Sequence, residues 1–489
     1  MCQTTEVGTT WTPRALVVGS GLAGLECALE LANAGWRVEV LSPGRAGCDG
    51  ATHRVHALAP WILLTAPWVR GDSPERFLAD LKRRGEGRER EGLAEVLATE
   101  AHSAARELVE NLGLVPLGVP TALPGDEIAR GMRCLPNAGR VLLAPLLRKC
   151  EEAGVRVCGR SLAVGLLSDG SRVIGTVMID RTTHVPREGH SDAVVLACGG
   201  VGAIFPATTA PRWNRGSGLA LGSAAGALLH GPEVTQALPV TATPPLYFPT
   251  SAALLSSRIR ASDGASVSGS DLGAVTVEIG KALLRGATVF METMGDDAHW
   301  LPPRVRESAA FRAEGRVPLT LALHHGIGGV AIDSWGRTSL PGLYACGEAA
   351  GGVQGLRRTM GTGLLEATIF AKRAARAACH DIAGIGPAPS RGEARVPPFP
   401  LDPAILEERL DELMGPLVAL RPPAAVDFAL HEIERWPVRV EARIEEGCAL
   451  AGIRRLAAMT LLAGEQSRRG GRGNVVGLPG NPPRHKEGA

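Results

Sequence analysis

The sequence predicts an α/β protein with a Rossmann-like domain. An early stretch, "LVVGSGLAG", has the form of a strand, a glycine turn and the start of a helix. A second glycine-rich turn, "GLYACGEAAGG", follows another short apolar strand far along the chain. The chain has 489 residues, of which 45% are hydrophobic, enough to bury a large core. This length predicts about two to four domains.

Composition and charge exclude several classes of partner. The 52 basic and 50 acidic side chains leave a net charge of +2, so no general field attracts nucleic acid or an anionic membrane. We therefore expect small-molecule partners. The 10 cysteines include no CxxC pair, which predicts no metal or iron–sulfur site and a reducing compartment. With no leader sequence and no membrane span, the chain is expected to be cytoplasmic.

The first glycine turn lies between two expected strands, 15–18 and 37–41, and opens a helix over about 21–34. Gly19, Gly21 and Gly24 fit the pattern G-x-G-x-x-G in this setting. The first glycine permits the turn, the second lets a pyrophosphate approach, and the third lets helix and strand pack closely. The turn predicts a dinucleotide site at the N-terminus of the helix.

One position departs from that pattern. The second strand normally ends in an acidic residue that binds a ribose, and here Ser42 stands in its place. Glu39 is expected on the opposite strand face and does not replace it.

Three strand-to-glycine turns are spread over the chain, since "AVVLACGG" (193–200) adds one to the two above. This arrangement favours FAD over NAD, because FAD is longer and lies deeper. The late turn would bring Glu348 to the cofactor, where it accepts hydroxyl hydrogen bonds.

These stretches resemble one family, the flavoproteins that comprise L-aspartate oxidase and the flavoprotein subunits of succinate dehydrogenase and fumarate reductase. The resemblance covers nearly the whole chain and includes "GDSPERFLADLKRRG" and "VLACGGVGAIFPATTAPRWNRGSGLALGSAAGALL". It is most specific over 324–375, where "HHGIGG", "GLYACGE" and "LLEA" fall at the family's spacings.

The resemblance implies three parts. An FAD-binding Rossmann-like domain would comprise 1–230 and 325–388, and an inserted α+β capping domain would span 231–324. A C-terminal helical domain would cover 400–470, after a linker at 385–403 and before a tail, 471–489. The end of this tail, "GNPPRHKEGA", is expected to be disordered.

The resemblance also implies which residues hold FAD, and that the bond is noncovalent. The covalent branches attach FAD to a histidine at the position of Ala51, which cannot bond to it. His53 and His56 lie nearby in a different register and are the alternatives. The residues expected to contact FAD are Gly19, Gly21, Leu22, Ala23, Gly24, Ser42, Ala51, Thr52, Ala197, Gly199, Gly200, Glu348 and Leu364.

The family chemistry is hydride transfer between the flavin and a four-carbon dicarboxylate. By the family spacing, His324 and Arg358 bind the substrate carboxylates, and we assign them as the catalytic residues. Arginine suits this role because its planar fork binds a carboxylate through two hydrogen bonds. His325 and Arg357 are expected to be bystanders.

The substrate half departs from the family at several positions. Leu238 stands where a histidine precedes the proline, and Ser256 is followed by Ser257 where a glutamate is usual. Gln354 and Arg357 replace a histidine and an asparagine.

The arginine that acts as the proton donor in the family is missing from a shortened capping segment. Arg258 or Arg260 could supply the charge, although structural salt bridges are at least as plausible.

The resemblance therefore implies an FAD-dependent oxidoreductase similar to L-aspartate oxidase, which forms iminoaspartate for NAD biosynthesis. Its electron acceptor would be oxygen or fumarate, and its pathway partner quinolinate synthase. Two alternatives stay open: a soluble fumarate-reductase or succinate-dehydrogenase type flavoprotein, and a weakly catalytic flavin-binding subunit.

Overall fold

The computed structural model describes most of the chain as far as residue 395. The described residues are 11–54, 61–123, 126–135, 139–183, 185–205, 207–232, 234–242, 247–249, 254–255, 258–292, 303–307, 311–312, 315–382, 387–389 and 393–395. The helices expected over 400–470, the tail and His56, Ser256 and Ser257 lie outside them.

The centre of the molecule is a parallel sheet of five strands in the order β18-β10-β1-β2-β6. The inner strands are buried on both faces, as expected where a parallel sheet is covered on each side. The strands are β1 (Arg14–Val18), β2 (Arg37–Leu41), β6 (Arg156–Cys158), β10 (Ala193–Leu196) and β18 (Leu343–Ala345). The predicted α/β fold class and the early strand, helix and strand are confirmed.

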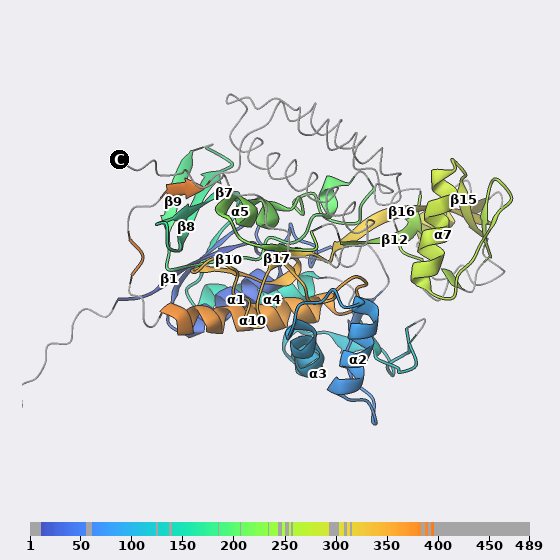
Figure 1. The fold of residues 1–489 in the computed structure, drawn as a ribbon, viewed down its shortest axis with the longest axis horizontal. Coiled ribbons are helices and arrows are strands. Elements are labelled where there is room, and N and C mark those ends of the chain that lie inside the picture. The colour runs from blue at the N-terminus through green and yellow to red at the C-terminus, as the bar shows by residue number, and fades with distance from the viewer. Residues whose placement is uncertain are drawn as a thin grey trace, which may run out of the picture.

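Helices cover one face of this sheet and a second sheet covers the other (Figure 1). The helical layer contains α1 (Leu22–Asn33), α3 (Leu93–Leu112), α4 (Arg140–Glu152) and α10 (Gly363–Ile382). Gly35, at φ +86°, takes the left-handed conformation just after α1 and lets the chain turn back into β2. The second sheet is antiparallel, in the order β20-β7-β8-β9: β7 (Ser161–Ser168), β8 (Val173–Asp180), β9 (Pro186–His190) and β20 (Glu393–Arg395). Helix α5 (Ser217–Ala225) packs beside β7.

A further sheet stands at one end of the molecule, away from the parallel sheet (Figure 1). Its order is β12-β16-β15-β13-β14, and the two long strands β12 (Thr235–Thr241) and β16 (Arg316–Gly326) connect it to the main body. The other elements here are β13 (Arg258–Ala261), β14 (Ser266–Val267), α7 (Leu272–Leu284), β15 (Val289–Glu292) and α8 (Pro303–Arg306). This part has its own hydrophobic core, in which Val240, Ile279, Val289 and Met291 are fully buried.

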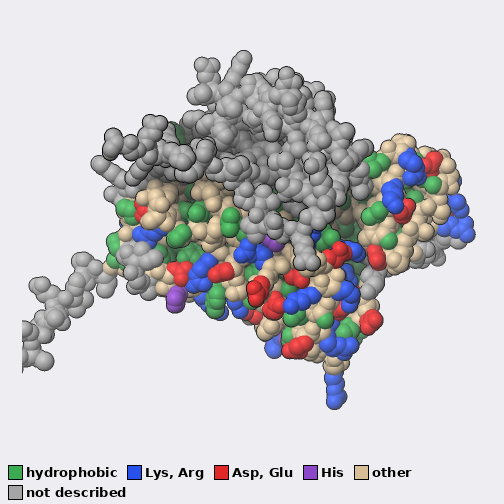
Figure 2. All heavy atoms as spheres, in the orientation of Figure 1, with side chains coloured by type: hydrophobic (Ala, Val, Ile, Leu, Met, Phe, Trp, Pro, Cys, Tyr) green, Lys and Arg blue, Asp and Glu red, His purple; other side chains and the backbone are tan. Residues whose placement is uncertain are grey.

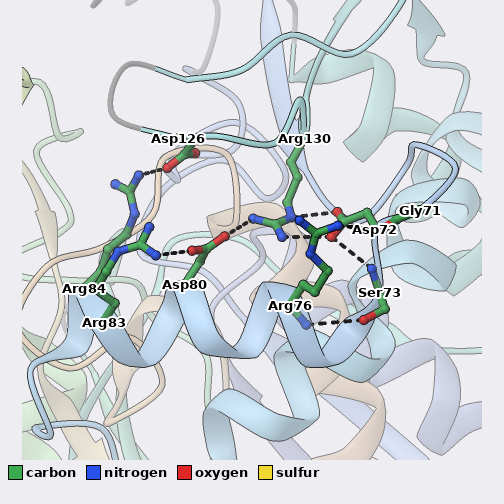
Figure 3. Close-up of polar contacts among 9 residues, drawn as sticks. All are labelled: Gly71, Asp72, Ser73, Arg76, Asp80, Arg83, Arg84, Asp126 and Arg130. Atoms are coloured by element: carbon green, nitrogen blue, oxygen red, sulfur yellow. Dashed lines mark hydrogen bonds and ion pairs between the residues drawn. The ribbon is translucent and has the colours of Figure 1, made fainter.

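A small sheet of β3 (Ile62–Thr65), β5 (Gly131–Leu135) and β4 (Val115–Pro116) packs near helix α2 (Pro74–Gly85). Arg130, only 1% exposed, joins the helix to this sheet. Its Nε and Nη2 atoms donate to Asp72 at 2.7 and 2.8 Å, and Nη1 pairs with Asp80 (Figure 3). A buried charge needs such partners, so these charges in "GDSPERFLADLKRRG" have a structural role.

The remaining strands, β11 (Leu229–His230), β17 (Gly329–Ala331) and β19 (Ala350–Gly351), form a short sheet where the chain passes between the two main parts. Figure 2 shows basic and acidic side chains interspersed over the visible described surface, in agreement with the small net charge. No helix among the described residues is long and apolar enough to cross a membrane.

Candidate functional site

A cavity of about 300 Å³ lies at the carboxyl ends of β1, β10 and β18 and extends to strand β12. Most residues selected from the sequence line it: Gly19, Gly21, Leu22, Ala23, Ser42, Ala51, Thr52, Ala197, Gly199, His324, Glu348, Arg358 and Leu364. They come from segments hundreds of residues apart, which meet because parallel strands end at the same edge of the sheet. Gly24 and Gly200 lie behind the wall of the cavity.

The first glycine turn brings backbone to the cavity without side chains. Gly19 has φ +120°, and a Cβ atom there would collide with the carbonyl of Ala197. A Cβ atom on Gly24 would collide with the carbonyl of Gly19, so this glycine keeps helix α1 close to the sheet. Gly21 is the N-cap of α1, and Leu22 N donates to Thr52 Oγ1 at 3.4 Å. The helix N-terminus therefore faces the cavity and favours an anion.

Glu348 enters the cavity from the late glycine turn. Its Oε1 atom accepts from Gly326 N at 2.9 Å, and Oε2 lies 3.4 Å from Asn214 Nδ2. A Cβ atom on Gly200 would collide with this side chain, so Gly200 leaves room for the carboxyl group. Burial raises the pKa of Glu348 to about 7.

Both histidines of "HHGIGG" line the cavity, which the sequence analysis did not expect of His325. The register of β12 and β16 pairs Gln236 with His325 and then Ala237 with Leu323, so His324 is the extra residue of a β-bulge. A bulge lets consecutive side chains face the same side of a sheet. His325 Nδ1 lies 3.5 Å from Glu348 Oε1.

His324 is held from the opposite side by Thr209, whose Oγ1 atom lies 2.9 Å from His324 Nδ1. Burial, and then the charge of Arg358, lower the pKa of His324 to about 3. The imidazole is therefore neutral near pH 7. When the threonine hydroxyl donates to Nδ1, Nε2 carries the proton and can donate a hydrogen bond toward the cavity; when Nδ1 carries the proton, Nε2 is an acceptor.

Arg358 brings the fixed positive charge of this part of the cavity. Burial lowers its pKa, and Glu366 and Glu348 oppose that effect, but a guanidinium stays charged in proteins. Its Nη1 atom lies 3.2 Å from Gln236 Oε1. Its Nε atom is buried and has no protein partner. A buried cation with an unused donor is a binding site for an anionic group such as a carboxylate.

Three apolar side chains also line the cavity. Leu238 and Phe248 line the cavity and are 3% and 6% exposed. Met360 lines it from the loop before α10. The position where the family has a histidine thus presents a hydrocarbon surface that excludes water.

Several residues considered from the sequence lie elsewhere. Arg357 is exposed and pairs with Glu86, while Arg260 is exposed and lies 3.5 Å from Glu292. Arg258 is exposed as well. Neither capping arginine lines the cavity, so within the described residues neither replaces the missing one.

The last two positions considered from the sequence are Gln354 and Ala51. Gln354 Nε2 donates to Thr362 Oγ1 at 2.6 Å and also to Glu366. Ala51 lines the cavity, whereas His53 is not among the lining residues.

The parallel sheet, its glycine turns and the cavity, which extends to strand β12, define a dinucleotide-binding protein with two parts. Residues 14–364 match the family described as "FAD binding domain". The chain belongs to this family and is an FAD-dependent oxidoreductase related to L-aspartate oxidase.

Sequence relatives include an L-aspartate oxidase of Caulobacter vibrioides, 32% identical over 93% of this chain and 92% of the relative. An L-aspartate oxidase of Streptomyces coelicolor is 31% identical over 79% of this chain and 73% of the relative. Among solved structures, quinol fumarate reductase FrdA from E. coli superposes with a TM-score of 0.77 at 16% identity, covering 93% of this chain and 89% of that chain. The likeness to this structure shows the fold alone.

The residues present fit FAD. The glycine turn leaves no side chain between the N-terminus of α1 and the cavity, as a pyrophosphate requires. Glu348 offers a carboxyl group to hydroxyl donors, and the buried Oδ2 atom of Asp49, also in the lining, has no hydrogen-bond partner. The sequence analysis did not identify Asp49, Thr209, Asn214 or His325, because their roles depend on contacts between distant segments.

Proposed function

We propose that the chain oxidises L-aspartate to iminoaspartate. The observation that carries this proposal is the meeting of Arg358 and His324, which line the same cavity as the glycine turns and lie close enough for the charge of Arg358 to lower the pKa of His324. The L-aspartate oxidase relatives, 31% and 32% identical, support the substrate class. The reaction removes a hydride from Cα and a proton from the amine, and FAD, when bound, supplies the two-electron acceptor.

The residues of the chain position the substrate. Arg358 binds one carboxylate through its unused Nε–H and its terminal nitrogens. His324 donates from Nε2 to the other carboxylate in the tautomer in which the Thr209 hydroxyl donates to Nδ1. Leu238 and Phe248 exclude water from the same space, which strengthens both contacts.

Anaerobic mixing of the purified yellow protein with L-aspartate tests the proposal. We expect the visible flavin absorbance to bleach with L-aspartate and to persist with D-aspartate. Persistence of the absorbance with L-aspartate, together with bleaching by succinate, would favour the succinate-dehydrogenase alternative. No bleaching with either acid would favour the weakly catalytic flavin-binding subunit.

Electron transfer to oxygen is proposed to be faster than transfer to fumarate. Reduction of fumarate needs a proton donor, and the capping arginines among the described residues lie outside the cavity lining. Reoxidation of the reduced protein by fumarate without oxygen should therefore be slow. Rapid reoxidation would show that a donor exists.

FAD is proposed to be held without a covalent bond, since Ala51 lines the cavity where the covalent branches carry histidine. Acid precipitation should leave yellow flavin in the supernatant. Colour that stays in the pellet would contradict this and would direct attention to His53 and His56.

We also propose that 1–230 with 325–388 form the FAD-binding domain and 231–324 the capping domain, which the separate core around Ile279 supports. A cytoplasmic location is proposed from the free thiols of the described cysteines. Limited proteolysis and fractionation of the source cells test these two points.

A further inference from the structure

The end of strand β2 is the place where this architecture usually binds a ribose through an acidic side chain. Ser42 occupies the position and is only 1% exposed. Its Oγ atom accepts from Ser20 Oγ at 2.9 Å, and Ser20 Oγ accepts from Gly47 N at 3.0 Å. The hydroxyl group of Ser42 is thus part of a network that holds the following loop.

Glu39, the other acidic residue of β2, is engaged elsewhere. Its Oε1 atom lies 2.6 Å from Arg187 Nη2 and 3.2 Å from Cys158 Sγ, and Arg156 lies 3.7 Å from Oε2. Glu39 is not among the residues that line the cavity. It stabilises the contact between the sheets and leaves the ribose position without its usual partner.

Asp49, in the loop after β2, places a carboxylate near the end of this strand. Asp49 lines the cavity together with Ser42 and Pro43. A Cβ atom on Gly44 would collide with Asp49 Oδ2, so a glycine at 44 is what allows the carboxylate to lie against the end of β2. The Oδ2 atom is buried and has no hydrogen-bond partner in the protein.

The surroundings keep this carboxylate available as an acceptor. Burial raises the pKa of Asp49, and the charges of Arg212, His53 and Arg181 oppose that rise. Arg181 is fixed by its Nη1 donating to Pro43 O at 2.9 Å and by stacking 4.5 Å from the ring centroid of Trp213. Trp213 also lines the cavity. A carboxyl group with an unused, buried oxygen gains a hydrogen bond when a ligand brings a donor to it.

We propose that Asp49 binds the ribose of the adenosine half of FAD, accepting hydrogen bonds from its hydroxyl groups in place of the acid absent at position 42. The ribose hydroxyls are the donors that a dinucleotide brings to the end of the second strand, next to the pyrophosphate at the helix N-terminus. A diphosphate at the same point would be repelled by Asp49, so the hydroxyl groups fit it best. The inference concerns how FAD is held and does not depend on the substrate proposed above.

Binding of FAD to the flavin-free protein tests the role of Asp49. The measurement is the dissociation constant from quenching of flavin fluorescence, for FAD and for its analogue with 2′-deoxyadenosine. We expect Asp49→Asn to weaken FAD binding about ten- to a hundred-fold, as for loss of a charge-assisted hydrogen bond. The wild type should prefer FAD to the 2′-deoxy analogue, and the preference should be smaller in the variant, because its amide oxygen is a weaker acceptor than a carboxylate.

Glu39→Gln is the matched control, because it neutralises a nearby acid that lies on strand β2 and outside the cavity lining, and it should keep the wild-type FAD affinity. FMN, which lacks adenosine, should bind wild type and Asp49→Asn equally. Thermal unfolding of the flavin-free proteins reports folding, and Asp49→Asn should unfold at a temperature close to that of the wild type.

Unchanged or tighter FAD binding by Asp49→Asn overturns the proposal. So does equal affinity of the wild type for FAD and the 2′-deoxy analogue, a comparison that needs no variant. If Asp49→Asn does not fold, Asp49→Ala takes its place, and a loss of preference for the ribose hydroxyl is expected because alanine has no acceptor.

Discussion

The Nη1 atom of Arg358 lies 3.2 Å from the Oε1 atom of Gln236, and this contact joins the loop before α10 to strand β12. The contact places the guanidinium group of Arg358, which belongs to the flavin-binding part, next to the sheet that contains β12. With the Nε atom of Arg358 buried and unpartnered, the junction of these two parts is where a carboxylate would be held.

Arg358→Ala should therefore abolish dicarboxylate binding and leave the FAD content nearly unchanged. Loss of a buried carboxylate anchor typically costs about 2 to 5 kcal/mol, or tens- to thousands-fold in affinity. Titration of the flavin spectrum with succinate measures the effect. Arg357→Ala is the matched control, because Arg357 is exposed and pairs with Glu86. An unaltered titration in Arg358→Ala would remove this residue from the site.

Thr209→Val should raise the KM for L-aspartate with little change in kcat. Valine has nearly the shape of threonine but cannot engage His324 Nδ1, so the imidazole loses the contact that directs Nε2 into the cavity. One such hydrogen bond is worth about 1 kcal/mol, or roughly fivefold in KM. Thr209→Ser keeps the hydroxyl group and should behave as wild type. Equal behaviour of the valine and serine variants would show that the contact has no positioning role.

Leu238→His should strengthen dicarboxylate binding. The side chain at 238 faces the cavity on the strand that carries Gln236, and an imidazole there adds a donor for the second carboxylate. We expect the dissociation constant of succinate to fall about tenfold, the effect of one well-placed hydrogen bond to a charged group. Leu238→Met, which keeps volume and apolar character, is the control and should leave it unchanged. No gain in the histidine variant would mean that the carboxylate lies away from position 238.

Glu348 should make the flavin-free protein less stable as pH rises. Burial raises its pKa from 4.5 to about 7, so the folded protein keeps a proton that the unfolded chain releases above pH 4.5. The contribution of protonated Glu348 to the free energy of unfolding is fully present below about pH 4.5 and is lost as pH rises through about 7. Glu348→Gln removes this titration. Between about pH 4.5 and 7, its free energy of unfolding should rise relative to that of the wild type by up to about 3 kcal/mol.

Denaturant unfolding of the two flavin-free proteins at a series of pH values measures this difference. The unfolding free energies should diverge between about pH 4.5 and 7 and run parallel above that range. A difference that is independent of pH would mean that Glu348 is already ionised in the folded protein.

Local sequence patterns account for the fold around the first glycine turn. A short apolar run, an amphipathic stretch and the spacing of Gly19, Gly21 and Gly24 predict β1, α1 and β2 to within a residue or two of the observed bounds. Such signals are readable because each depends on neighbours within one turn or strand. The gathering of Gly199 and Glu348 at the same cavity also follows, since successive parallel strands end at one edge of the sheet.

The side-chain contacts inside the cavity could not be predicted from local sequence patterns. His325 faces Glu348 because a bulge at His324 shifts the register of β12 and β16, and no feature of "HHGIGG" encodes a bulge. Asp49 reaches the end of β2 only because Gly44 leaves space for its carboxylate. Short-range sequence patterns determine the backbone conformation and indicate the class of protein. The pairing of side chains depends on how segments hundreds of residues apart pack.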